Sequence, residues 1–359
     1  MASYYVTTSG SDANAGTSEG AAWATPGYAM SQVTGGDTVY IKQGTYTLTS
    51  ATQNVSGGAV LVPDDVIFEG YQTSAGDRAA FATISAGAVA PSYIVQLASS
   101  GVNSNRNACY AIKVDGNGQS VNGFDNGSGL YNSALVNCLA DDCTIGFQTS
   151  RYGFTYGCSA TNCTSGFYGG GPTIHCFAKN CSNEGFNTVS QNRWTDFQNC
   201  IASGCGTGFQ LGNSWPQCVS NCVAYNSTAD GFAAIYGDLF YARACIAVNN
   251  GGYGFNYGSG TGQTMLVDCA SYGNTSGRKR STATPDLEIR SIVLTSDPFT
   301  DAANDDFTLN NTAGAGADCR QIQASMLAGV NVSLDIGAIN SVTAAAGCGT
   351  TPKHPLGRF

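Results

Sequence analysis

Short hydrophobic segments recur through the middle of the chain, and within each of them apolar residues alternate with polar or small ones. Four examples are ALVNCLA, VSNCVAY, ARACIAV and MLVDCAS, which begin at residues 134, 219, 242 and 265. Alternation with a period of two, bounded by Gly, Asn, Ser or Thr, is typical of half-buried β-strands. The pattern therefore predicts a series of short strands in this region rather than helices.

The segments belong to a repeat that is marked by a Gly-Phe pair. The Phe residues of the seven pairs are Phe124, Phe147, Phe167, Phe186, Phe209, Phe232 and Phe255, at steps of 23, 20, 19, 23, 23 and 23 residues. Each repeat also has a first cysteine, at Cys138, Cys158, Cys176, Cys200, Cys222, Cys245 and Cys269. Five residues after each cysteine stands a second small residue: Cys143, Cys163, Cys181, Cys205, Ser227, Asn250 and Asn274.

A repeat of this length favours one architecture over its competitors. A leucine-rich repeat would need its own leucine pattern, and a propeller blade would need about 40 residues. A unit of about 23 residues with short strands and polar corners fits one coil of a parallel β-helix, where equivalent residues stack at about 4.8 Å. We expect the first cysteines to point inward from strands as small hydrophobic residues, the Phe rings to stack, and the Gly before each Phe to adopt a corner conformation.

Both ends of the chain resemble a known superfamily. The segments YYVTTSGSDANAGTSEGAAWATPGYAM and GGDTVYIKQGTYTLTS, and later DPFTDAANDDFTLNNTAGAGADC and DIGAIN, resemble the entry and closing coils of the pectate-lyase-like right-handed parallel β-helix superfamily. The resemblance implies an all-β fold, a single-stranded right-handed solenoid of about 11–12 coils with an N-terminal capping helix. It leaves the chemistry open, because one fold hosts many functions.

The predicted domain organisation follows the repeat. Residues 1–37 form an N-terminal strand and helical cap, 38–310 the β-helix, 311–340 a closing C-terminal cap, and 341–359 an extended arm. Charged residues make up 11% of the chain and the net charge is −9, which argues against a nucleic-acid partner. We find no signal-peptide pattern and no apolar run of the ~20 residues that a membrane-spanning helix needs. We expect no cofactor and no structural zinc, since the chain has two His and no paired CxxC motif.

Candidate catalytic residues are few. Calcium-dependent lyases of the superfamily hold the ion with carboxylates on one exposed sheet, but the acidic residues here do not recur in one register. Polygalacturonase-type hydrolases use an adjacent Asp pair and a downstream His, for which Asp141, Asp142 and His175 are the available residues. His175 lacks the flanking glycines of those hydrolases. We therefore expect Asp141 and Asp142 to lie in a solvated turn and His175 to be a packed or hydrogen-bonded residue.

The 15 cysteines are an odd number, so at least one thiol has no partner within the chain. Cys348, Cys319, Cys109 and Cys218 lie off the repeat and are candidates for cross-links. Cys348 stands in the C-terminal arm near Lys353, His354 and Arg358, where positive charge favours the thiolate.

Two functional hypotheses follow. In the first, the protein is made in a host cytoplasm and becomes a structural component of a bacteriophage virion: a capsid decoration or minor capsid, collar or fibre protein. It would be a homotrimer that contacts other virion proteins through its rigid rod and arm. In the second, it is a secreted polysaccharide lyase or glycoside hydrolase of the superfamily. A glycan-binding tailspike is a third possibility.

Overall fold

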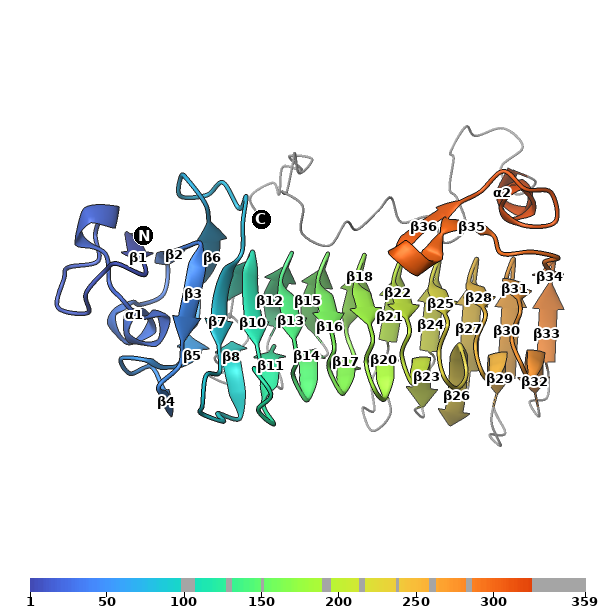
Figure 1. Ribbon diagram of the computed structural model, residues 1–359, viewed down its shortest axis with the longest axis horizontal. Coiled ribbons are helices and arrows are strands. Elements are labelled where there is room, and N and C mark those ends of the chain that lie inside the picture. Colours follow the sequence, from blue (N-terminus) through green and yellow to red (C-terminus); the bar gives the residue numbers. More distant parts are fainter. Residues whose placement is uncertain are drawn as a thin grey trace.

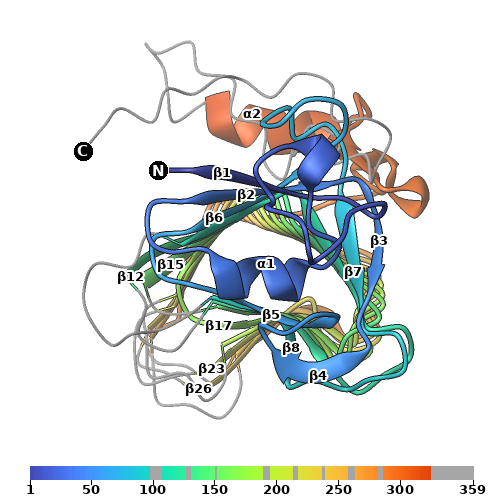
Figure 2. The same ribbon diagram turned by 90° about the vertical axis from the view of Figure 1, so that its left-hand side faces the viewer.

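A computed structural model describes residues 1–97, 107–126, 131–149, 152–188, 195–212, 217–236, 239–257, 263–281 and 286–324. The chain forms a rod of stacked coils, each of which adds one strand to each of three parallel sheets (Figures 1 and 2). The predicted all-β parallel β-helix is confirmed, with sheets of 12, 11 and 11 strands. We name them sheets A, B and D.

Sheet A opens each coil. Its strands, in spatial order, are β1 (Ser3–Val6), β2 (Thr38–Lys42), β6 (Ile67–Tyr71), β9 (Ala108–Tyr110), β12 (Tyr131–Val136), β15 (Tyr152–Tyr156), β18 (Pro172–Ile174), β21 (Thr195–Gln198), β24 (Gln217–Ser220), β27 (Leu239–Arg243), β30 (Gln263–Val267) and β33 (Asp286–Ile289).

Sheet B follows sheet A across a tight corner. Its strands are β3 (Gly44–Thr47), β7 (Ala82–Ser85), β10 (Ile112–Asp115), β13 (Leu139–Asp141), β16 (Ser159–Thr161), β19 (Phe177–Lys179), β22 (Ile201–Ser203), β25 (Val223–Tyr225), β28 (Ile246–Val248), β31 (Ala270–Tyr272) and β34 (Ile292–Val293).

Sheet D closes each coil. Its strands are β4 (Ser50–Gln53), β5 (Gly58–Val62), β8 (Tyr93–Leu97), β11 (Asn122–Asp125), β14 (Ile145–Thr149), β17 (Ser165–Gly169), β20 (Glu184–Asn187), β23 (Thr207–Gly212), β26 (Phe232–Tyr236), β29 (Tyr253–Tyr257) and β32 (Gly277–Ser281).

The core consists of inward-facing ladders. The seven repeat Phe rings of sheet D form one continuous stack, with centroids 4.6–5.1 Å apart and planes within 9° of parallel. All seven rings are at most 1% exposed. In the coil of Phe124 the inward residue of sheet B is Val114, and in the other six coils it is alanine, at Ala140, Ala160, Ala178, Ala202, Ala224 and Ala247. In these six coils the large rings of sheet D are therefore matched by the smallest side chain on sheet B.

The Gly before each Phe does not adopt the corner conformation that the sequence suggested. None of these glycines has a positive φ angle. They lie where sheets B and D approach each other: a Cβ atom on Gly185 would lie 2.8 Å from the Gly208 carbonyl oxygen and 2.9 Å from the Ala202 Cβ atom. These glycines are required for close approach between coils and sheets, not for backbone rotation.

The corner conformation belongs instead to the residue that precedes each first or second cysteine of the repeat. Asn137, Asn162, Asn180, Asn199 and Asn221 all have φ between 51° and 54°. Asn tolerates this left-handed region better than other residues with a side chain. The first cysteines follow at these corners rather than within strands, which corrects the expectation above, and their side chains are buried.

The two ends of the rod carry extra elements. The helix α1 (Pro26–Gln32) lies across the N-terminal end and buries Ala29 and Met30 (Figure 2). A 3-10 helix, η1 (Glu19–Ala21), precedes it. Near the other end come β35 (Phe299–Asp301), η2 (Ala302–Asn304), β36 (Asp306–Leu309) and α2 (Gly316–Ala324).

This closing segment packs on the outer face of sheet B, where Phe299 and Phe307 join a cluster with Phe177 and Val223. Lys179 forms an ion pair with Asp305 at 2.5 Å. The residues of the predicted cap and arm beyond 324 lie outside the described part of the chain.

The Phe stack yields a stability prediction. Replacing Phe209 by Ala removes a fully buried ring from the middle of the stack and should lower the free energy of unfolding by about 3–5 kcal/mol. Because repeat proteins are stabilised mainly by neighbouring units, new protease cleavage should appear near residues 186–232. Urea unfolding and proteolysis mapping measure both effects. Phe154→Ala, at a ring that is 37% exposed, is the control and should cost about 1 kcal/mol or less. Equal losses in the two variants would contradict this account of the core.

Candidate functional site

The outer face of sheet A carries a row of aromatic and charged side chains. Register aligns one outward residue from each coil, in the order Tyr5, Tyr40, Glu69, Tyr110, Val136, Tyr156, Ile174, Gln198, Ser220, Arg243, Val267 and Ile289. We call this the sheet A row. Tyrosines occupy four of its first six positions, so its N-terminal half presents phenol groups to the outside of the rod.

Glu69 and Arg78 form the charged centre of this row. Arg78 Nη2 donates to Glu69 Oε2 at 2.7 Å, and the guanidinium carbon lies 3.7 Å from the centroid of the Tyr110 ring. Glu69 is 3% exposed, and its Oε1 atom has no hydrogen-bond partner. A guanidinium, a carboxylate and a phenol ring thus meet at one point of the sheet.

Arg78 reaches this position from the connection between β6 and β7. The Asp77 carboxylate holds the connection by accepting hydrogen bonds from the backbone N–H groups of residues 72, 73, 74 and 79, at 2.7–3.0 Å. Arg78 itself has a φ of 48°, in a region that costs free energy for a residue with a side chain. The backbone is therefore fixed in an uncommon conformation that carries the guanidinium over sheet A.

The ionisation states follow from the surroundings. Burial tends to lower the pKa of Arg78, but the hydrogen bond and charge of Glu69 outweigh this effect and raise it, so Arg78 stays cationic. Burial raises the pKa of Tyr110, although Arg78 opposes the shift. Burial and then the charge of Glu69 raise the pKa of Tyr40. Both phenols are therefore protonated at neutral pH and can donate hydrogen bonds.

A second aromatic feature lies further along the same face. The rings of Phe154 and Tyr156 are stacked with centroids 5.9 Å apart, and the side chains are 37% and 39% exposed. His175 packs edge-on against Tyr156 at 5.2 Å. Exposed pairs of parallel rings offer flat apolar surfaces, to which the C–H faces of sugar rings can bind.

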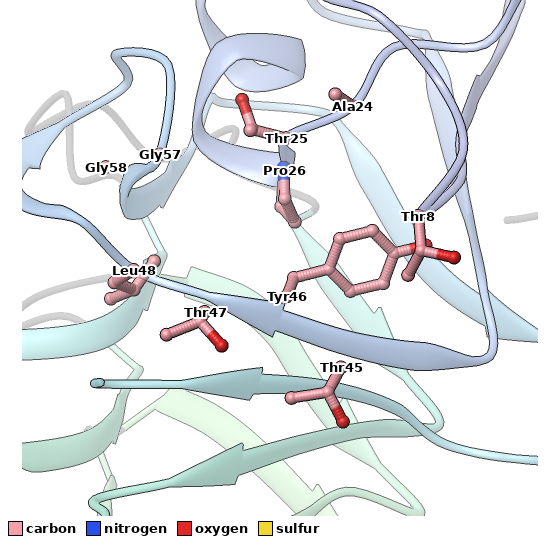
Figure 3. A pocket seen from close by; sticks show the side chains of 10 residues that line it. All are labelled: Thr8, Ala24, Thr25, Pro26, Thr45, Tyr46, Thr47, Leu48, Gly57 and Gly58. Atoms are coloured by element: carbon pink, nitrogen blue, oxygen red, sulfur yellow. The ribbon is translucent and has the colours of Figure 1, made fainter.

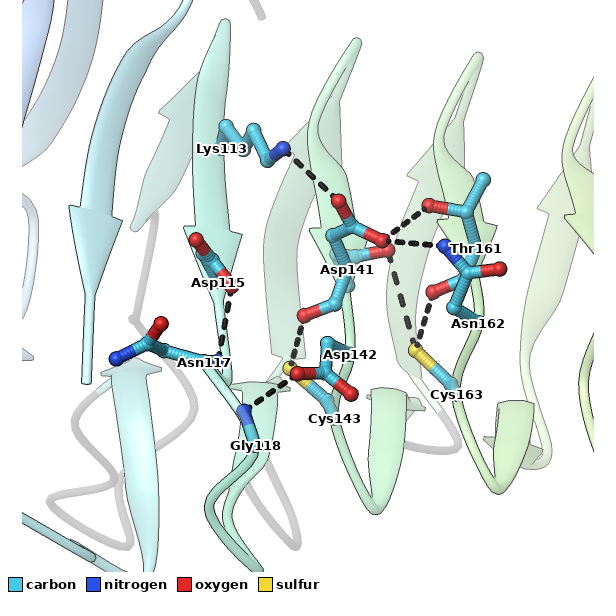
Figure 4. A network of polar contacts seen from close by, with 11 residues as sticks. Lys113, Asp115, Asn117, Gly118, Asp141, Asp142, Cys143, Thr161, Asn162 and Cys163 are labelled. Carbon is cyan, nitrogen blue, oxygen red and sulfur yellow. Dashed lines mark hydrogen bonds and ion pairs between the residues drawn. The ribbon is translucent and has the colours of Figure 1, made fainter. Parts of the chain in front are cut away.

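The three residues suggested for hydrolysis do not come together. Asp141 faces outward from sheet B, where its carboxylate pairs with Lys113 at 3.0 Å and accepts hydrogen bonds from Thr161 and Asn162 (Figure 4). Asp142 follows at the corner toward sheet D with a φ of 53°. It accepts a hydrogen bond from the backbone of Gly118.

His175 stands at the opposite corner of sheet B, two coils further on, with a φ of 55°. Its position in the coil is that of Asn137 and Asn199, so it is a corner residue. Burial lowers its pKa, which leaves the imidazole neutral at pH 7.

The off-repeat cysteines have three different settings. Cys109 lies in β9 and Cys319 in α2, and both are fully buried, while Cys218 points outward from β24 and is half-buried. All 14 cysteines in the described part of the chain are free thiols. Cys348 lies outside the described residues.

A crevice of about 180 Å³ lies beside the N-terminal cap, between α1, β3 and β5 (Figure 3). Four of the ten residues that line it are threonines, and the Tyr46 hydroxyl donates a hydrogen bond to the Lys42 carbonyl oxygen at 2.8 Å. No charged side chain lines it, so it offers no acid–base chemistry.

Within the described ranges, no three or more His, Cys, Asp or Glu side chains are grouped so that they could hold a metal ion. Over the same residues, no helix has the length and apolar character needed to cross a membrane.

Comparison with solved structures places the fold. A rhamnogalacturonan lyase superposes with a TM-score of 0.56 at 16% identity, over 82% of this chain and 87% of the lyase. The A-module of the Azotobacter vinelandii mannuronan C-5 epimerase AlgE4 superposes with a TM-score of 0.51 at 14% identity, over 72% and 87%. The chain has the right-handed, pectate-lyase-like parallel β-helix fold.

The resemblance stated from the sequence is thereby confirmed at the level of fold. No protein-family model matches the chain, and no curated protein matches it either. Identities this low establish the β-helix alone, so the chemistry has to be argued from the residues of the site.

The connection that holds Arg78 should respond to acid. Partial burial tends to raise the pKa of Asp77, but four backbone hydrogen bonds outweigh it and lower the pKa to about 2. A lowered pKa means that this carboxylate stabilises the connection above about pH 4, its ordinary value, and that the contribution is lost as the pH falls through about 2.

Limited proteolysis with pepsin between pH 4 and 1.5 should therefore cut first within residues 72–79 as the pH falls. Asp77→Ala should make the same segment sensitive to neutral proteases at pH 7. Resistance of that segment in the variant would show that Asp77 does not hold it.

Proposed function

We propose that the protein is a polysaccharide lyase that binds its glycan along the outer face of sheet A. The observation that carries the proposal is the contact of Glu69, Arg78 and Tyr110 within a row of outward tyrosines. Arg78 supplies positive charge, Glu69 a carboxylate with an unpaired oxygen, and Tyr110 a protonated phenol.

The sheet A row suits an extended polymer. Its residues repeat at the coil spacing of about 4.8 Å, which is close to the length of one sugar unit. Tyr40, Tyr110 and Tyr156 occupy alternate coils, so they can contact every second sugar of a chain that runs parallel to the rod. The exposed rings of Phe154 and Tyr156 extend the same surface.

The cluster contains the groups that β-elimination requires. In this reaction a base removes the proton next to a uronate carboxylate, a carbon–carbon double bond forms, and the glycosidic C–O bond breaks as its oxygen takes a proton. Glu69 Oε1 can accept the first proton, Tyr110 can donate the second, and Arg78 can stabilise the charge that builds up on the carboxylate. Glu69 is almost fully covered, so the segment 72–79 has to shift to admit a substrate.

Hydrolysis is less well supported. A glycoside hydrolase needs two carboxyl groups about 5–9.5 Å apart across the scissile bond. Glu69 is the only acidic residue of the sheet A row, while Asp141 belongs to sheet B and Asp142 to the corner that follows it. We therefore favour elimination.

The virion hypothesis, including a homotrimer with other virion proteins as partners, stays a prediction. No observation of the described residues favours it over glycan processing. A tailspike that binds glycans could use the same sheet A row, and an assay for bound polysaccharide without cleavage separates that role from a lyase.

The central test is an elimination assay with purified protein. Rhamnogalacturonan, pectate and mannuronan are incubated with it, and unsaturated products are followed by their ultraviolet absorbance. Activity on at least one polymer is expected. Glu69→Gln and Tyr110→Phe should each lower kcat/KM by about 10²–10⁴-fold, the usual range for loss of a general acid or base.

Asp141→Asn and Asp142→Asn serve as matched controls, since both carboxylates lie outside the sheet A row, and both variants should keep wild-type activity. A lyase activity that survives Glu69→Gln but is lost in Asp141→Asn would refute the assignment. Binding without cleavage of any polymer would leave only a glycan-binding role.

A further inference from the structure

A second row of outward side chains runs along sheet D, on a different face from the sheet A row. Register aligns Gln96, Asp125, Gln148, Tyr168, Asn187, Gln210, Ala233, Asn256 and Arg280. We call this the sheet D row. Eight of these nine members are polar and Ala233 has no polar group; at the N-terminal end the register continues the row to another apolar residue, Leu61.

The short side chain of Ala233 leaves a hollow in the row. A cavity of about 320 Å³ lies over Ala233, between Gln210 on one side and Asn256 on the other. Thr207 and Asp230 line it as well, and Ala234 and Ile235 complete it. Its volume is at the lower end of the range of about 300–1,000 Å³ that is typical of small-molecule sites.

The backbone is irregular at the same place. Leu211 pairs with Ala234, but the next residue, Gly212, pairs with Tyr236, so β26 has a bulge that contains Ile235. Bulges change the direction of side chains and are frequent beside binding sites. Here the bulge brings Ile235 to the hollow, while the rings of Phe209 and Phe232 beneath stay stacked at 4.8 Å.

The polar groups of the hollow are held in place. Asp230 accepts hydrogen bonds from the Tyr253 backbone N–H at 2.7 Å and from Asn256 Nδ2 at 2.6 Å. Asn256 Oδ1 has no hydrogen-bond partner. Gly252 leaves room for this arrangement, since a Cβ atom there would lie 2.2 Å from Asp230 Oδ1.

The residues that line the hollow limit the class of ligand that it can bind. The single carboxylate, together with a net charge of −9, disfavours anions, and one carboxylate that already accepts two hydrogen bonds cannot satisfy a calcium ion. Amides, a hydroxyl and a carboxylate can bind several hydroxyl groups, while Ala234 and Ile235 can contact C–H groups. We propose that this hollow binds one neutral sugar unit, independently of the sheet A row.

The test uses the full chain and four probes: methyl glucoside, methyl galactoside, methyl mannoside and sodium glucuronate. Saturation-transfer NMR should detect at least one neutral glycoside, with a dissociation constant on the order of millimolar, as expected for so small a ligand. Ala233→Gln should abolish binding, because the preceding coil has Gln at this position, Gln210, and a Gln at 233 would fill the gap. Asp230→Asn should weaken binding about tenfold through loss of a charge-assisted hydrogen bond.

Ala229→Gln is the matched control, since it adds the same side chain at an exposed corner of the same coil, and it should bind like wild type. Tyr110→Phe should also bind like wild type, which separates this site from the sheet A row. The proposal fails if no neutral glycoside binds, if only glucuronate binds, or if Ala233→Gln keeps wild-type affinity.

Discussion

The close approach of sheets B and D is the constraint on which the rod depends. Between Gly185 and the next coil there is no space for even a methyl group, and Ala202 limits the approach from sheet B. From β14 to β29 this contact is made by Gly on sheet D and Ala on sheet B, and the Phe that follows each Gly fills the remaining volume. Because parallel coils place equivalent residues above one another, the same requirement recurs from coil to coil over this stretch and produces the repeat.

This constraint explains why the fold could be predicted from the sequence. A Gly-Phe pair at steps of 19–23 residues records a contact that is made once per coil. The conformations were harder to predict, because Gly can serve either close approach or a positive φ angle. The corner conformation is indicated in the sequence by the Asn that precedes Cys138, Cys163 and Cys181. In a short polar turn, Asn-Cys is a corner residue followed by a buried one.

The candidate site was not predictable in the same way. Tyr40, Glu69 and Tyr110 are 29 and 41 residues apart, which does not match the repeat, and only the strand register aligns them. Arg78 comes from a connection without any repeat. Asp141, Asp142 and His175 drew attention as residue types, yet Asp142 and His175 occupy the left-handed corner positions and Asp141 pairs with Lys113. Their placement is explained by the coil geometry.

Inward and outward rows are therefore under different constraints. An inward residue must match its neighbours in the coils above and below, whereas an outward residue can vary without disturbing the core. At β26, for example, the bulge and Ala233 alter the surface, while Phe232 stays stacked on Phe255 at 5.1 Å. At β6 the long connection that bears Arg78 leaves the inward Phe68 fully buried. Specific chemistry in such a rod is therefore to be sought where a coil departs from the repeat on its outer face, since departures on the inner face would destabilise the stack.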